Sequence, residues 1–245
     1  MHHNTNIETT GAAYDGAIPF TVGARGAGRR PASLQKQAGR LHHNTKTVVF
    51  CWELGGGLGH LMQMRPLAQE LVHRGHRVFV ALRLLGPAER AFAGTGVFYL
   101  QAPCDPERGA AAAKPFPVTR SFPHVLANVG WGQARALGAL ASAWRNMFRM
   151  LRPDLVVCDH SPTALLASRG LPARRALIGS GFCCPPDVTP WAVYPPPPGM
   201  TPRDDDEPEA LASDERRLLG RVNRVLESWS WGQTATRLSG SWTRY

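Results

Sequence analysis

The chain has little lysine, and its basic residues lack the arrangement that nucleic-acid binding needs. Only three of the 28 basic residues are lysines (Lys36, Lys46 and Lys114), so the formal charge of +10 comes mainly from arginine. The arginines are scattered, and no tract alternates basic with aromatic residues in the way that follows a phosphate backbone. We therefore expect no nucleic-acid partner.

The sequence also lacks a long apolar run and a secretion signal. No segment approaches the roughly 18–20 consecutive apolar residues that a membrane-spanning helix needs. Residues 1–44 lack the continuous apolar core of a signal peptide. We therefore expect a cytoplasmic protein without a transmembrane segment.

Metal-binding and redox motifs are missing as well. The five cysteines are an odd number at irregular spacing, and no pair has the C-x-x-C spacing of a zinc or redox site. Cys51 and Cys158 stand inside apolar runs, where a free cysteine behaves as a small buried hydrophobe. We expect reduced thiols and no bound metal.

What the sequence does contain is a regular alternation of short apolar runs and amphipathic segments. Residues 1–44 show neither the strand nor the helix period and predict a disordered leader. Residues 45–182 alternate strands with helices, which predicts an α/β fold with a doubly wound parallel sheet (Rossmann-like). The predicted strands are 47–52, 76–82, 97–102, 154–158 and 174–178, and the predicted helices are 61–74, 87–93, 121–151 (broken near 130–132) and 162–169.

The composition changes after residue 182. Proline and acidic residues in 183–208 predict a solvated loop, and 209–228 has the apolar stripe of an amphipathic helix. Residues 229–245 hold three tryptophans without period or caps. We interpret this irregular tail as the product of a frame shift or a premature stop.

Two ionisable residues follow predicted strands. His60 comes after a glycine-rich turn at the end of the first strand, and Asp159 ends the strand at 154–158. Ligands of open α/β sheets bind beyond the carboxyl ends of the strands, where neighbouring parallel strands bring such residues together. A histidine held by a carboxylate is a general base with a fixed tautomer. In the alternative reading both residues only cap helices, and Glu53 and His160 are further candidates for the chemistry.

The glycine-rich turn supplies Gly55, Gly56, Gly57 and Gly59, which allow the backbone to approach a ligand closely. Amides at the start of the following helix are placed to face an anion. The run matches neither the Rossmann fingerprint, whose third glycine would stand at His60, nor the P-loop.

These motifs resemble the opening of the family 1 glycosyltransferases. The similar features are the first strand, Gly-Gly-Gly-Leu-Gly-His at 55–60, and the helix and strand at 66–78. Residues 153–159 resemble the later strand of the family, and 170–173 the turn that follows it. The resemblance covers about residues 46–227 and is strongest to bacterial enzymes that glycosylate macrolides, flavonoids or other lipophilic acceptors. It implies the N-terminal, acceptor-binding half of a GT-B fold.

The resemblance also implies a mechanism. The histidine matching His60 removes the proton of an acceptor hydroxyl, and the aspartate matching Asp159 steadies the imidazolium. The hydroxyl then displaces the diphosphate of a UDP- or TDP-sugar, with inversion at the anomeric carbon and without a metal.

The chain departs from the family in having no segment that resembles the donor-binding domain. We therefore expect a truncated transferase that transfers no sugar by itself. Two alternatives remain open at this point. One is a non-catalytic subunit that docks a separate donor-binding chain, and the other is a free-standing small-molecule-binding module.

Overall fold

The computed structural model describes residues 44–104, 114–180, 188, 191–195, 199 and 207–229. Its elements are β1 (Thr47–Trp52), α2 (Gly59–His73), β2 (Arg77–Leu82), α3 (Ala88–Phe92), β3 (Phe98–Gln101), α4 (Phe122–Leu126), η2 (Ala127–Trp131), α5 (Ala134–Leu151), β4 (Leu155–Asp159), α6 (Pro162–Ala167), β5 (Arg174–Ile178) and α7 (Pro208–Ser228). Nearly all of the predicted leader and tail, and parts of the loops 103–120 and 183–208, lie outside the described residues.

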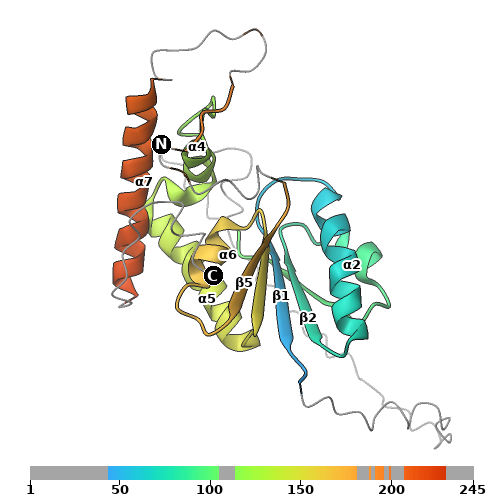
Figure 1. Cartoon of the computed structure of the whole chain (residues 1–245). Helices are drawn as coiled ribbons and strands as arrows, with labels where there is room; N and C mark the ends of the chain where they lie inside the picture. The colour runs from blue at the N-terminus through green and yellow to red at the C-terminus, as the bar shows by residue number, and fades with distance from the viewer. Residues whose placement is uncertain are drawn as a thin grey trace, which may run out of the picture. The chain divides into compact units, whose positions relative to one another are not determined.

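The five strands form one parallel sheet in the order β3-β2-β1-β4-β5 (Figure 1). The crossover from β3 to β4 reverses the direction in which strands are added. The carboxyl ends of β1 and β4 therefore lie side by side at the point where this strand order places a ligand crevice. The predicted doubly wound sheet is confirmed.

Successive residues of β1 supply the two faces of the sheet. Val48, Phe50 and Trp52 pack with apolar residues of α2 and α3 in one core. Val49 and Cys51 belong to a second core with α5, α6 and α7. Because side chains alternate along a strand, a continuous apolar run is what a strand covered on both faces requires.

Helix α2 starts two residues earlier than predicted and contains a proline. Pro66 lies in the helix interior, where it removes a backbone hydrogen bond. Leu67, the residue after this proline, is exposed. The predicted end is confirmed: Gly75 has φ +85°, its N–H bonds Val72 O, and the N–H of His76 bonds Leu71 O, as in a Schellman motif.

The predicted break in the segment 121–151 also appears. Gly130, inside η2, has φ +114°, and this kink in the backbone lies between α4 and α5. The break redirects the chain so that α5 runs along the sheet face while α4 lies against α7, as Figure 1 shows.

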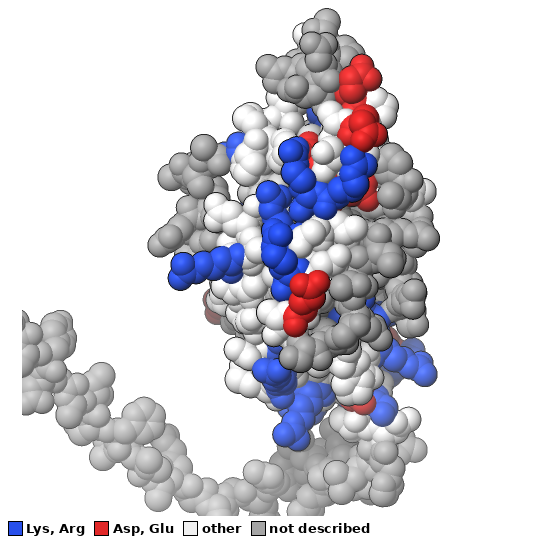
Figure 2. All heavy atoms as spheres, turned by 90° about the vertical axis from the view of Figure 1, so that its left-hand side faces the viewer, with Lys and Arg blue, Asp and Glu red and all other residues white. Residues whose placement is uncertain are grey.

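Helix α7 is an integral part of the second core. Its side chains Leu218, Val222 and Val225 are buried with residues of α5 and η2. The opposite side of the helix carries the exposed residues Arg216 and Arg224, and Figure 2 shows basic side chains gathered on this face. The helix predicted as a separate segment after the sheet domain thus shares the core of that domain.

Candidate functional site

The structure brings His60 and Asp159 together at the carboxyl edge of the sheet. In the parallel pairing of β1 with β4, Trp52 is the register partner of Asp159. His60 is the second residue of α2, which begins after the turn that follows β1. Its Nδ1 lies 3.0 Å from Oδ2 of Asp159, a hydrogen-bond distance. The prediction that these two side chains share one edge of the sheet is confirmed.

The pair is sheltered on the carboxylate side and open on the imidazole side. The Asp159 side chain is fully buried, whereas 16% of the His60 side chain is exposed. The imidazole stacks on the buried ring of Trp52, with 5.1 Å between ring centroids. These contacts fix the orientation of the His60 ring.

Burial raises the pKa of Asp159, while the hydrogen bond with His60 acts in the opposite direction. Its second oxygen, Oδ1, has no hydrogen-bond partner among the described residues. His60 is therefore the one group in the described part of the chain that bonds this buried carboxylate. An ionised Asp159 accepts a hydrogen bond from the Nδ1–H of His60, and this tautomer leaves the Nε2 lone pair available to a ligand.

A side chain at position 55 would collide with His60, which is a different reason for glycine there than the close approach of a ligand inferred from the sequence. A Cβ atom at this position would lie 2.8 Å from Nε2 of His60, and the φ of +84° also favours glycine. Gly55 thus keeps the surroundings of Nε2 free of a side chain. Around Gly56, Gly57 and Gly59 an added Cβ would meet no atom within 4 Å, so these three positions leave room for close approach to the backbone.

Glu53 holds the turn after β4 in place. Its Oε2 accepts hydrogen bonds from Ser161 Oγ (3.0 Å), Thr163 N (2.7 Å) and Ala164 N (3.1 Å). These amides belong to the first turn of α6, whose donors have no partner within the helix. Burial raises the pKa of Glu53, and the same donors oppose that shift. Glu53, the residue after β1, therefore caps α6. Because three donors already bond its Oε2, this oxygen has no free lone pair for proton transfer.

His160 is the second alternative candidate, and its surroundings disfavour a role as a base. Its backbone has φ +46°, its carbonyl accepts the N–H of Leu54 at 3.0 Å, and its ring lies 6.0 Å from that of His60. Burial lowers the pKa of His160 to about 4, with the neighbouring His60 as a further cause. A neutral imidazole with so low a pKa is a weak proton acceptor.

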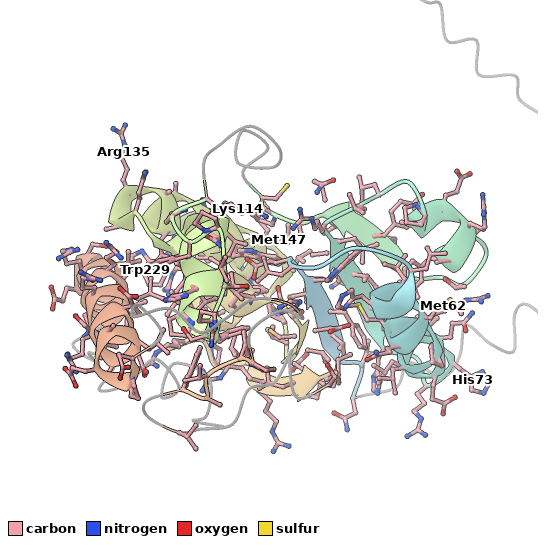
Figure 3. The ribbon with its side chains drawn as sticks, turned by 90° about the horizontal axis from the view of Figure 1, so that it is seen from above. Met62, His73, Lys114, Arg135, Met147 and Trp229 are labelled. Atoms are coloured by element: carbon pink, nitrogen blue, oxygen red, sulfur yellow. The ribbon has the colours of Figure 1, made fainter. Side chains whose placement is uncertain are left out.

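A cavity of about 550 Å³, with Glu53 and Leu54 in its lining, opens at the carboxyl edge of the sheet. Figure 3 looks onto this edge and labels Lys114, which lines the cavity, and Met62 on α2. Its lining combines apolar side chains with polar and charged ones, and small-molecule sites likewise use polar groups to orient a ligand. The lining residues are Glu53, Leu54, Arg83, Leu84, Pro103, Cys104, Lys114, Thr119, Val125, Asn128, Val129, Leu140 and Thr163.

A second histidine–aspartate pair was missed in the sequence. Nε2 of His124 in α4 lies 3.0 Å from Oδ2 of Asp214 in α7, and Nδ1 accepts the N–H of Arg120 at 3.2 Å. Both ring nitrogens are therefore occupied, and the pair fastens α7 to α4. The two residues are 90 positions apart, and no local pattern marks them.

Within the described ranges, no three His, Cys, Asp or Glu side chains gather in an arrangement that suits a metal ion. No helix of the described part of the chain is long and apolar enough to cross a membrane.

The fold and the site together define a Rossmann-like α/β unit with a histidine–carboxylate pair at its ligand edge. No protein-family model and no curated protein matches the chain. Among solved structures it is similar to the Streptomyces sp. SF2575 glycosyltransferase SsfS6, with 18% identity and a TM-score of 0.41 over 79% of this chain and 49% of that one.

Two further glycosyltransferases show the same partial similarity. SnogD from Streptomyces nogalater has 21% identity and a TM-score of 0.40 over 74% of this chain and 42% of that one. VinC, solved in complex with DTDP, has 17% identity and a TM-score of 0.40 over 78% of this chain and 45% of that one. The chain thus spans less than half of the length of each of these structures.

The buried His160 predicts a specific pH dependence of stability. The unfolded chain protonates this residue near its ordinary pKa of 6.5, whereas the folded chain does so only near 4. Stability is therefore lost as the pH falls from about 6.5 towards 4, by about 3 kcal/mol. His160→Asn tolerates the positive φ and removes the titration. Chemical denaturation at pH 7 and pH 4 should show a loss about 3 kcal/mol larger in the wild type. Equal losses in the two proteins would refute this account of His160.

Proposed function

We propose that this chain is the acceptor-binding part of an inverting glycosyltransferase that moves a hexosyl group from a nucleotide sugar to a hydroxyl of a lipophilic small molecule. The observation that carries the proposal is the 3.0 Å hydrogen bond between His60 and the buried Asp159. A carboxylate on Nδ1 leaves Nε2 as the proton acceptor, which is the arrangement a general base requires. The resemblance at residues 55–60 and 153–159 supports the choice of reaction.

In the proposed reaction the acceptor hydroxyl donates its hydrogen bond to Nε2 of His60. As the oxygen attacks the anomeric carbon, its proton passes to Nε2 and the bond from that carbon to the diphosphate oxygen breaks. The diphosphate leaves with the electron pair of that bond. Asp159 stabilises the imidazolium that forms, because the buried carboxylate is its direct hydrogen-bond partner.

The 550 Å³ cavity is the proposed acceptor site. Leu54, Leu84 and Val129 offer apolar contact for an aromatic or aliphatic acceptor, and Asn128 and Thr119 offer polar partners. Leu54 lies in the turn that joins β1 to the helix of His60, and the reacting hydroxyl of the ligand is proposed to lie between this cavity and His60. Gly56, Gly57 and Gly59 are proposed to face the nucleotide sugar, since their backbone is open to a ligand.

Exposed apolar side chains at the carboxyl edge support the docking of a donor-binding body there. Leu58 and Met62 beside His60 are 55% and 56% exposed, and Leu84 after β2 is 46% exposed. Large apolar side chains are less costly to expose when a second body covers them. This observation favours both the transferase and the alternative of a subunit that docks a separate donor-binding chain.

Removing the base should change how a phenolic acceptor is bound. In the wild type, a phenol such as 4-methylumbelliferone that hydrogen-bonds to Nε2 should shift towards its phenolate form. His60→Ala should retain binding, because the cavity is intact, but lose the shift. Absorbance titration at fixed pH measures both quantities without any sugar donor. A phenolate shift that persists in His60→Ala would contradict the assignment of the base.

Gly55 and Gly56 provide a matched pair of variants for the same assay. Gly55→Ala places a methyl group 2.8 Å from Nε2 of His60 and should abolish the phenolate shift. Gly56→Ala meets no atom within 4 Å and should leave the shift within about twofold of the wild type. Circular dichroism checks that both variants are folded. Equal effects of the two substitutions would show that access to Nε2 is not what Gly55 secures.

A further inference from the structure

A second cavity lies at the opposite, amino-terminal edge of the sheet. It has a volume of about 830 Å³, within the range of about 300–1,000 Å³ that ligand pockets take. Its lining includes the starts of β1, β4 and β5 and the end of α5. The apolar part of the lining is formed by Val48, Leu71, Phe148, Pro153, Leu155, Leu171 and Pro172. The catalytic proposal makes no use of this cavity, because His60 and Asp159 lie at the other end of the strands.

The charged part of the lining has an excess of positive charge. Asp154 is its one acidic residue, and that carboxylate is already engaged by Lys46 Nζ at 3.2 Å and by the N–H of Thr47 at 2.8 Å. The side chains of Arg149 and Arg174 are exposed and form no hydrogen bond or ion pair with another described residue. Arg152 shares these properties. Three guanidinium groups therefore line an apolar cavity, and no anion among the described residues pairs with them.

The backbone conformation at Arg152 does not require arginine at this position. Arg152 ends α5 with φ +49°, a left-handed conformation that glycine adopts most easily at this helix position. An arginine in place of glycine adds no described contact that would compensate. The side chain is thus better explained by what it can bind than by what it does for the helix.

We propose that this cavity binds an anionic amphiphile, namely a carboxylate or phosphate monoester joined to an aliphatic chain. Guanidinium groups bind both anions through paired hydrogen bonds, and the apolar lining accepts the chain. A small inorganic anion would leave the apolar lining uncovered. A neutral amphiphile would leave the arginines without a partner.

Calorimetric titration of the full 245-residue chain tests the proposal. The probes are dodecanoate and dodecyl phosphate below their micelle concentrations, with dodecyl maltoside and inorganic phosphate as references. Both anionic amphiphiles should bind saturably with one site per chain, and the two references at least about tenfold more weakly. The ratio of the two anionic affinities tells which head group the cavity prefers. No saturable binding, or equal binding of dodecyl maltoside, would overturn the proposal.

Substitutions locate the site. Arg149→Ala and Arg174→Ala should each weaken binding about tenfold, as expected for a lost hydrogen bond to a charged group. Arg135→Ala removes the same charge from the other end of α5, where Figure 3 shows Arg135 pointing away from the sheet, and should leave binding unchanged.

Arg152→Gly is the sharpest variant, because glycine suits the positive φ and the protein stays folded. It should weaken binding about tenfold without lowering the melting temperature. Equal weakening by Arg135→Ala and Arg149→Ala would mean that the ligand responds only to net charge, and this result would refute the proposed site.

Discussion

The parallel pairing of β1 with β4 positions the histidine–aspartate pair and the turns around it at the carboxyl edge of the sheet. Because Trp52 is in register with Asp159, the turn that leaves β1 passes directly over the turn that leaves β4. Three contacts join these turns: Glu53 caps α6, Leu54 bonds the carbonyl of His160, and His60 bonds Asp159. A buried carboxylate such as Asp159 is costly without a partner, so the same contacts that shape the site also make its burial tolerable.

The two histidine–aspartate pairs of this domain show that environment, and not residue type, determines the role. His60 has one nitrogen bound to Asp159, while a glycine keeps the region around the other free of a side chain. His124 bonds Asp214 through one nitrogen and a backbone N–H through the other, so it has no remaining lone pair. The first arrangement suits proton transfer, and the second suits the attachment of α7.

Much of the fold was predictable because the spacing of apolar residues along the sequence distinguishes strands from helices. Continuous apolar runs predicted the strands, and β1 is such a run. The pairing of His60 with Asp159 followed from the rule that parallel strands end at one edge.

Contacts between side chains that are distant in sequence were not predictable in the same way. The capping of α6 by Glu53 joins residues 108–111 positions apart, and the His124–Asp214 pair joins residues 90 apart. The start of α2 at Gly59 could not be predicted, because Leu58 at the N-cap provides no side-chain hydrogen bond that would mark it. The union of α7 with the main core depends on long-range packing against α5 and η2.

The most direct test of the central claim is the protonation state of each ring nitrogen of His60, measured by long-range ¹H–¹⁵N correlation NMR near pH 8. The account predicts a proton on Nδ1 and an unprotonated Nε2 in the wild type, with loss of this tautomer preference in Asp159→Ala. A proton on Nε2 in the wild type, or a tautomer unchanged in Asp159→Ala, would contradict it.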